Sequence, residues 1–554
     1  MNRHQNVLTR EEIRDTKKYS IADGSASNVM YGFGEQYVTA FALKLGASSS
    51  EIGILASVPS FIGSIFQIVG AKLTEHYQNR KKVVLFSVMM QALMILPLFI
   101  VPFFTKSILL LTIIFSLYFV FTNISAPGWN SWIGAVVADK ERAEYFSRRN
   151  KTTITALLIS VLAAGSILNY FTTVNIWVGF GILFSISFLG RLTSWYFLSR
   201  QFEPSYVINK EEAFSFKDFL KRLPETNFGN FVMFRSLMAF SVMIASPFFA
   251  VYMLKDLQFS YIQYTIIVLA PMLIKVLTIT YWGRYSKKLG TRNIMIVSAF
   301  LIGVIPLAWF IAGYFFFGHK IIFFLIMLAE MISGFAWAGF DLTTFNYILE
   351  TVSPGKRARC IAYFNILFGI CVLIGGLFGS WLVSSLPKSY YGASVLLVVF
   401  IISAVARFIV PTIFLSKLQE VKVQKNIAEK KLFMDLVIGK PLHSALHQTS
   451  QIVLYTDRGI KKVAKTTRKG LRLVKRPLDP VIHHVIIGLD KGLTKAENIR
   501  KSIVPKKFIL QKKKDYEELV NHDYNKYIRT DPIVIRKLRK LKSRKIRFRK
   551  ELKK

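Results

Sequence analysis

The sequence predicts an all-α, polytopic membrane protein with about twelve transmembrane helices and a basic C-terminal tail. Hydrophobic residues make up 52% of the 554-residue chain. They are gathered into runs of about 20 residues, the length that a helix needs to cross a bilayer. Short basic turns separate these runs. The ten-residue alternation that is typical of a transmembrane β-barrel does not occur in the sequence.

The hydrophobic runs fall into two sets of six, on either side of a polar segment, Gln201–Asn227. We therefore expect an N-terminal segment (1–19), a first bundle (20–199), a central loop (200–228), a second bundle (229–416) and a basic tail (417–554). The expected spans are about 20–46, 50–73, 83–104, 107–138, 152–173, 175–199, 229–254, 261–283, 293–317, 320–351, 360–385 and 390–416.

Lysine and arginine are divided unevenly between alternate loops. One set of loops is rich in them, as at 80–82 and 356–359, whereas the opposite loops hold about one each, such as Lys106 and Lys320. Cytoplasmic loops carry the excess of positive charge, so this bias predicts the orientation of a multi-pass protein. We expect that protein to lie in the cytoplasmic (plasma) membrane. The bias also places both termini and the central loop in the cytoplasm.

Two acidic residues, Glu330 and Asp341, lie inside the tenth expected span. They are 11 positions apart, so an α-helix places both on one face, ~16 Å apart along its axis. Trp337 lies on or near that face. A charge inside a membrane costs several kcal/mol unless it faces water or a partner, so both acids are candidates for a functional site. The alternative for each is a structural pair with a neighbouring helix.

The first expected span carries a polar stripe. Asn28, Tyr31, Glu35 and Thr39 follow one another at i, i+3, i+7 and i+11, which places them on one face of a helix. A helix that faces lipid does not carry such a stripe. We therefore expect this helix to face a cavity or another helix.

Two segments about 215 positions apart are alike, which indicates an internal repeat. Arg142-Ala143 falls on Arg357-Ala358, and Asn150 falls on Asn365. One half of the chain is therefore interpreted as a diverged copy of the other.

With twelve spans, a central loop and a repeat, the chain resembles the major facilitator superfamily of secondary transporters over about residues 20–416. The signature of that family between spans 2 and 3 is close to Gly-x-Leu-x-Asp-x-x-Gly-Arg-Arg. Here Leu73, Glu75 and Arg80 fit it, whereas Ala71 and Gln78 replace the glycines.

The second copy of the signature lies between spans 8 and 9. Its glycines, Gly283 and Gly290, fit the pattern, but Lys287 stands where an acid is usual. Each copy alone is a weak signal, and the two copies at equivalent places in a repeat are a strong one.

The resemblance implies two pseudo-symmetric six-helix bundles around a central cavity, lined by helices 1, 4, 7 and 10. The side chains of this sequence expected to line that cavity or to couple transport are Tyr31, Glu35, Asn123, Trp129, Asn130, Arg235, Glu330, Trp337 and Asp341. Trp129 could instead be packing bulk or an interfacial anchor. Arg235 could instead extend its charge to the membrane surface, which is the expected arrangement for Arg191 and Lys275.

The resemblance further implies a cytoplasmic latch that closes one side of the transporter. The residues expected in this latch are Glu75, Arg80, Arg142, Arg292 and Arg357. The implied function is transport of a small molecule by alternating access, with Glu35 or Asp341 as the proton-coupling group. We expect a monomer that binds a small-molecule substrate and protons within a lipid bilayer.

Other classes of protein are poorly supported by the sequence. There is no Gly-x-x-x-x-Gly-Lys-Ser/Thr phosphate loop and no His-Glu-x-x-His motif. The only cysteines, Cys360 and Cys371, form no zinc-binding pattern. We therefore expect no enzyme activity, no cofactor and no bound metal.

The tail holds much of the charge of the chain. Residues 418–554 contain 37 Lys and Arg against 13 Asp and Glu, about +24 of the net +41. Segments Gln451–Arg476 and Ile533–Leu552 mix apolar and basic residues at helix-like intervals, which suits an anionic lipid surface. Nucleic acid or ribosomal RNA would attract the same charge. A solvated extension and a transporter-like membrane anchor that works through its tail are the alternatives.

Overall fold

The computed structural model describes residues 8–205, 215–387, 389–390, 393–414 and 416–421. The expected tail helices, Gln451–Arg476 and Ile533–Leu552, lie outside the described residues.

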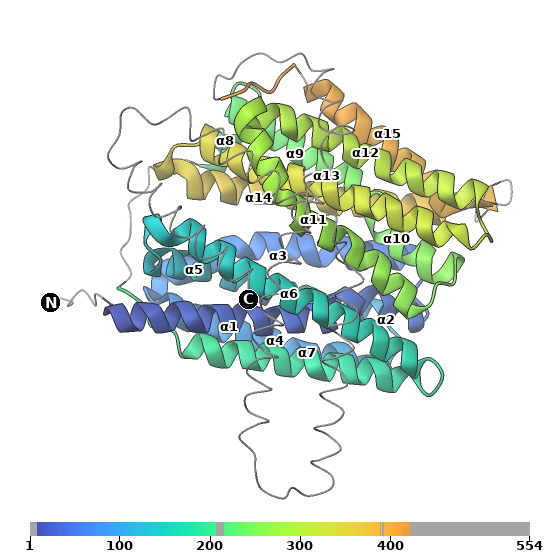
Figure 1. Ribbon diagram of the computed structural model, residues 1–554, viewed down its shortest axis with the longest axis horizontal. Helices are drawn as coiled ribbons and strands as arrows, with labels where there is room; N and C mark the ends of the chain where they lie inside the picture. Colours follow the sequence, from blue (N-terminus) through green and yellow to red (C-terminus); the bar gives the residue numbers. More distant parts are fainter. Residues whose placement is uncertain (1–7, 206–214, 388, 391–392, 415, 422–554) are drawn as a thin grey trace, which may run out of the picture. The chain divides into compact units, whose positions relative to one another are not determined.

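The first half of the chain forms one group of helices, coloured blue to green in Figure 1. Its elements are α1 (Arg10–Phe33), the short 3-10 turn η1 (Glu35–Tyr37), α2 (Val38–Lys44), α3 (Ser49–Tyr77), α4 (Arg80–Phe104), α5 (Ile108–Val136), α6 (Asp139–Phe171) and α7 (Ile176–Ser199).

The second half repeats this arrangement after a short helix in the central segment, α8 (Phe216–Arg222). Its elements are α9 (Asn227–Met243), α10 (Ser246–Val251), the π-helical turn η2 (Tyr252–Asp256), α11 (Tyr261–Leu289), α12 (Thr291–Phe315), α13 (Ile321–Thr351), α14 (Pro354–Ser385) and α15 (Val395–Phe414). Between α14 and α15 lie two short antiparallel strands of two residues each, β1 (Ser389–Tyr390) and β2 (Ala393–Ser394).

Among the described residues, eleven helices or joined helix pairs are long and apolar enough to cross a membrane. The run α1–η1–α2 is not one of the eleven, and α1 packs along α7, which is one of them. The prediction of an all-α, polytopic fold is therefore confirmed.

The first helix begins ten residues before the expected span. Thr9 and Glu12 form a capping box in which the backbone N–H of each donates to the side chain of the other, at 2.8 and 3.2 Å. The helix is interrupted after Gly34, where the backbone leaves the α-helical region. This break places Glu35 at the start of η1.

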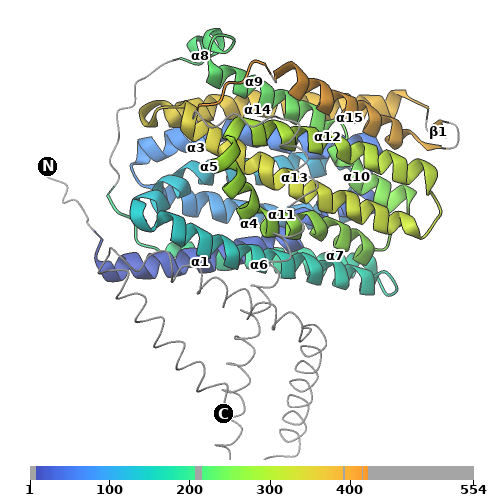
Figure 2. The ribbon, with the colours of Figure 1, turned by 45° about the horizontal axis from the view of Figure 1, so that its top comes forward.

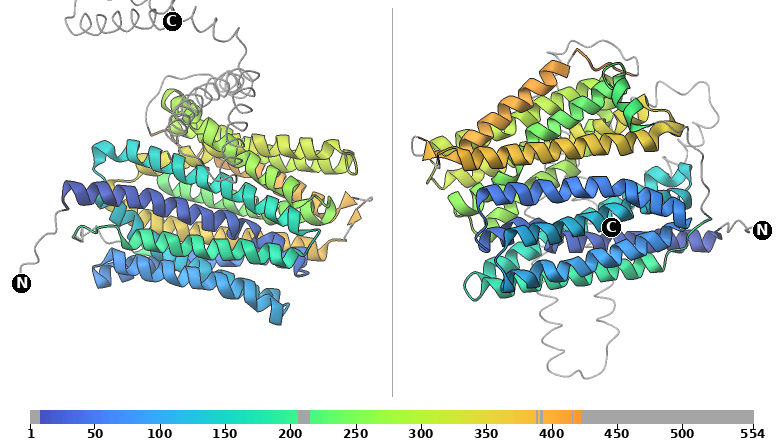
Figure 3. Two further views of the ribbon diagram at one scale, coloured as in Figure 1. Left: turned by 60° about the horizontal axis from the view of Figure 1, so that its bottom comes forward. Right: turned by 180° about the vertical axis from the view of Figure 1, so that it is seen from behind.

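The two halves contact each other through α3 and α14, which Figure 3 (right) shows side by side in blue and gold. Small residues allow this approach, since a Cβ atom on Gly376 would lie only 2.4 Å from Cβ of Ser57. Asn365 extends the contact by donating a hydrogen bond of 2.8 Å from Nδ2 to Oε1 of Gln67.

A second contact between the halves joins α6 to α11. A Cβ atom on Gly165 would lie 2.6 Å from Cβ of Thr265. The Tyr37 hydroxyl donates to the carbonyl of Val161 at 2.8 Å and lies 2.7 Å from Oγ1 of Thr265. Tyr37 is 1% exposed, so this contact is dry.

The connections α3–α4, α5–α6, α11–α12 and α13–α14 share one end of the bundles, which is on the left in Figure 1. We call it the basic end, because it carries Arg80, Lys81, Arg292 and Lys356. The other end is called the opposite end. The contact between Gly165 and Thr265 lies toward the opposite end.

Candidate functional site

Three charged side chains from three helices of the second half meet near the middle of the bundle. Asp341 of α13 accepts a hydrogen bond of 2.7 Å at Oδ2 from Nζ of Lys275, which lies midway along α11. Figure 2 shows α11 and α13 side by side. Nη2 of Arg235, from α9, lies 4.0 Å from Oδ1 of the same carboxylate. We call Arg235, Lys275 and Asp341 the charged triad.

The exposed part of the triad lies opposite a row of exposed apolar side chains on α13. Phe324, Leu328 and Ile332 are exposed and follow one another every four residues, which marks the outer side of α13. Asp341 comes nine positions after Ile332, half a turn around the helix. Its side chain is nevertheless 38% exposed, on the side of the helix opposite Ile332. Phe345, one turn further along, is exposed as well.

Arg235 is held by aromatic rings. Its guanidinium carbon lies 5.0 Å from the ring centroid of Phe340 and 4.8 Å from that of Phe368. Trp337 packs edge-on against Phe340 at 5.7 Å. The side chain of Arg235 is 13% exposed, and its Nε has no hydrogen-bond partner in the part of the chain that the structure describes. Its charge is therefore stabilised mainly by ring faces and by Asp341.

Glu35 belongs to a different site, within the first half. The Tyr118 hydroxyl, from α5, lies 3.0 Å from Oε2 of Glu35 and 3.0 Å from the sulfur of Met30. Tyr31, one turn earlier on α1, is half-buried. The polar stripe of the first span thus includes a carboxylate that is bound to the neighbouring α5.

Glu330 does not join Asp341, although both lie on α13. Its Oε1 accepts a hydrogen bond of 2.9 Å from Nε1 of Trp309, in α12. Trp309 is fully buried against Phe249 and Phe400. Glu330 also interacts electrostatically with Arg407, in α15. These contacts place Glu330 inside the packed second half.

In the contacts that the structure describes, the expected side chains of α5 do not join the triad. Nδ2 of Asn123 donates to the carbonyl of Phe119 on its own helix, at 2.9 Å. The guanidinium of Arg149 lies 4.6 Å above the ring of Trp129, and Asn130 is exposed.

Two of the expected latch arginines, Arg80 and Arg292, make equivalent contacts with a glutamate in the two halves. Glu203, just after α7, accepts hydrogen bonds from the backbone N–H and from Nε of Arg80, at 2.8 and 3.1 Å. Glu420, after α15, accepts from the backbone N–H groups of Thr291 and Arg292, at 3.1 and 2.9 Å. Each carboxylate therefore caps the positive N-terminus of a helix, α4 or α12, within its own half.

The other expected latch residues do not form an ion pair across the halves in the described contacts. Glu75 is exposed. Nη2 of Arg142 donates to the carbonyls of Gly134 and Val137 at the end of α5. Arg357 lies in α14, and its side chain is outside the described part of the structure.

The expectation that Lys275 and Arg191 reach the membrane surface was wrong. Lys275 lies 14 residues from each end of α11, because this helix continues six residues beyond the expected span. Arg191 is buried and donates from Nη1 to Ser27 and Ser194.

The partners Glu203 and Glu420 were not predicted from the sequence. They are 217 positions apart, close to the offset of the internal repeat. That offset is the signal that could have identified them.

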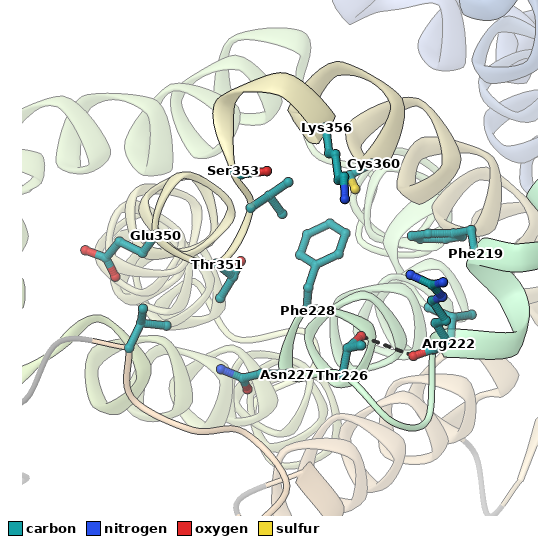
Figure 4. Close-up of a pocket in the computed structure, with 13 residues that line it drawn as sticks. Phe219, Arg222, Thr226, Asn227, Phe228, Glu350, Thr351, Ser353, Lys356 and Cys360 are labelled. Carbon is teal, nitrogen blue, oxygen red and sulfur yellow. Dashed lines mark hydrogen bonds between the residues drawn. The ribbon is translucent and has the colours of Figure 1, made fainter. Parts of the chain in front are cut away.

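A separate cavity of about 590 Å³ lies at the basic end of the second half (Figure 4). It is bordered by α8, α9, the end of α13 and the start of α14, and its lining includes Arg222, Phe228 and Lys356. The lining does not include the charged triad. This cavity is therefore distinct from the predicted site.

The comparisons with known proteins agree with this architecture. A family profile described as Major Facilitator Superfamily matches residues 25–236 and 231–478. A comparison with curated protein sequences gives no significant match.

Three similar solved structures are transporters or homologues of transporters. A mutant of the nucleoside transporter NupG has a TM-score of 0.58 at 13% identity, covering 73% of this chain and 100% of that one. A proton-dependent oligopeptide transporter has a TM-score of 0.58 at 12% identity, covering 73% and 98%. A bacterial homologue of the iron transporter ferroportin has a TM-score of 0.54 at 12% identity, covering 74% and 99%. At these identities the similarity shows the fold alone.

Proposed function

Because the chain belongs to the Major Facilitator Superfamily of transporters, we propose that it moves a small molecule across the cytoplasmic membrane by proton-coupled alternating access. It is a multi-pass membrane protein and not an enzyme. The observation that carries the proposal is the charged triad, which is contributed by three helices and whose Lys275 and Asp341 side chains are 42% and 38% exposed.

The contacts between the halves support alternating access. The dry contact of Tyr37, Val161 and Thr265 lies toward the opposite end, and the seam of α3 and α14 reaches from there to Gln67 and Asn365. This pattern fits a state that is closed at the opposite end. Rocking of the halves about such contacts would close the basic end instead.

Asp341 is the proposed proton-coupling group. When it is ionised, its carboxylate holds the ammonium of Lys275 at 2.7 Å. A proton on Asp341 removes that attraction and releases Lys275 for other partners, so proton binding changes what the triad can bind. Glu35, bound to Tyr118 in the first half, is the second candidate for the same role.

The test measures proton movement in proteoliposomes that contain an entrapped pH indicator. The purified full chain is screened against a panel of small molecules under an imposed pH gradient. Asp341→Asn should abolish substrate-driven proton movement, and Glu225→Gln, an exposed acid in the central segment, should leave it unchanged. The coupling assignment is wrong if Asp341→Asn and Glu35→Gln both behave like the parent.

We further propose that the basic end faces the cytoplasm, since cytoplasmic loops carry the excess of Lys and Arg. In a variant without native cysteines, a cysteine at the exposed position Lys320 should react with an impermeant maleimide added outside intact cells. A cysteine at Lys356, at the basic end, should react only after the cells are opened. The reverse result would invert the topology.

The charge of residues 418–554 favours a second candidate function, a membrane anchor that acts through its tail. Truncation should follow Val421, because Glu420 caps α12. Retained transport by the truncated chain supports the carrier. If no transport is ever detected and truncation removes binding to anionic vesicles or RNA, the anchor is supported instead.

A further inference from the structure

We propose that the substrate carries a carboxylate or phosphate group, which Arg235 and Lys275 bind together. This inference rests on the proposed transport function and adds the chemical class of the substrate. It follows from the charge of the triad, from the unused hydrogen-bond donors of Arg235 and from the aromatic rings around it.

The triad has an excess of positive charge. Two cations, Arg235 and Lys275, share one carboxylate, Asp341, so the group carries +1 when Asp341 is ionised and +2 when it is protonated. Glu330, the other acid of α13, is bound to Trp309 and does not neutralise this excess. Because charges inside a membrane protein need a partner, the arrangement is complete only with an added anion.

Arg407 and Arg235, two arginines of the same half, differ in how many of their N–H groups are hydrogen-bonded. Arg407 is 2% exposed, and its three nitrogens donate to Oγ of Ser403 and to the carbonyls of Ile302 and Val242, at 3.1 to 3.2 Å. Among the described residues, Arg235 pairs with one acid, Asp341, at 4.0 Å, which is too long for a hydrogen bond. Each nitrogen of the Arg407 guanidinium therefore has an acceptor, whereas the Arg235 guanidinium has N–H donors for which the described residues provide no acceptor.

The surroundings of Arg235 indicate how an anion would be held. The rings of Phe340 and Phe368 fix the plane of the guanidinium, and a fixed fork of N–H groups matches the two oxygens of a carboxylate or phosphate. Lys275, which is 42% exposed, supplies a second charge that can turn from Asp341 to the ligand. Trp337, half-buried beside Phe340, provides an apolar surface for the rest of the molecule.

Asp341 and the substrate anion then compete for Lys275. A proton on Asp341 ends that competition, so protonation strengthens anion binding. The consequence is movement of the proton and the anion in the same direction.

The experiment uses the purified full chain in detergent and a matched set of aromatic probes. Benzoate and phenyl phosphate are anions, benzamide is neutral and benzylamine is a cation. The readout is the shift of Tm with probe concentration, from which an apparent Kd follows. We expect the anions to raise Tm and the neutral and cationic probes to leave it unchanged.

Arg235→Gln and Lys275→Gln should each raise the apparent Kd for the anions by about tenfold or more, because a charge-assisted hydrogen bond is lost. Lys320→Gln, which removes an exposed cation at the other end of α13, is the matched control and should bind as the parent does. Arg235→Lys keeps the charge without the fork and should show an intermediate loss, which separates binding from misfolding.

The inference is overturned if no anion raises Tm, if benzamide or benzylamine stabilises as well as benzoate, or if anion binding survives both glutamine substitutions. Proton movement driven by a neutral or cationic compound would also overturn it while leaving the proposed carrier intact. Anion binding without any proton movement in proteoliposomes would instead keep the binding site and refute the proposed proton coupling.

Discussion

Glu330 and Asp341 lie eleven residues apart on α13, yet their surroundings differ in kind. Glu330 accepts a hydrogen bond from a fully buried tryptophan and lies near an arginine that is bonded to backbone carbonyls. Asp341 lies between two cations and is 38% exposed, and Nε of one of those cations, Arg235, has no acceptor among the described residues. Of two acids on one helix face, one can therefore serve stability and the other function. They are distinguished by whether the groups around each acid already have hydrogen-bond partners.

The largest expected effect is on transport. Asp341→Asn should lower proton-coupled flux in proteoliposomes by about 100-fold or more, since the coupled step is lost rather than weakened. Glu330→Gln keeps an acceptor for Trp309 and should retain flux within about twofold. Equal losses of flux in the two variants would show that Glu330 and Asp341 do not differ in their role in transport.

The next effect concerns stability. Arg407→Met removes one donor from each of the carbonyls of Ile302 and Val242 and leaves Glu330 without its cation, so the free energy of unfolding should fall by about 3–5 kcal/mol. Arg235→Met should lower it by less than about 1 kcal/mol, because no hydrogen bond is lost and Met packs well between rings. Thermal unfolding of both variants in the same detergent measures the difference. A larger loss for Arg235→Met would show that its role is structural.

A smaller effect is expected at the two tryptophans. Trp309→Phe removes one N–H group that Glu330 accepts from and should cost about 1–3 kcal/mol, because a buried carboxyl loses one of its donors. Trp337→Phe keeps the edge-on ring packing and should leave Tm nearly unchanged while weakening anion binding. If Trp337→Phe lowers Tm as much as Trp309→Phe does, the two ring environments are energetically alike.

The smallest effect on stability is expected where Glu420 caps α12 in the second half. Glu420→Gln retains one acceptor for the N–H groups of Thr291 and Arg292 but loses the negative charge at the start of α12, at a cost of about 1 kcal/mol. Glu429→Gln, further along the chain, is the control. Truncation after 417 should be less stable than truncation after 421, and equal Tm values for the two truncated chains would contradict the capping role.

The span pattern, the repeat and the all-α fold could be predicted because hydropathy and loop charge are local properties of the sequence. The neighbours of each charged residue could not. The spacing of Glu330 and Asp341 predicts one shared face, but their partners depend on which helices cross α13 at each depth. Lys275, 66 positions before Asp341, becomes its partner only through the packing of α11 on α13. The break after Gly34 that positions Glu35 likewise had no strong local signal.

The contacts of Arg80 with Glu203 and of Arg292 with Glu420 each lie entirely inside one half of the chain. The segment that follows the last helix of each half is thus bound by hydrogen bonds within that half. A break in the chain between 206 and 214 would leave the hydrogen bonds of Glu203 and of Glu420 intact. The protein should therefore assemble from two separately translated fragments, 1–205 and 215–554, which co-purify because α3 packs against α14. Each half could then be labelled independently of the other.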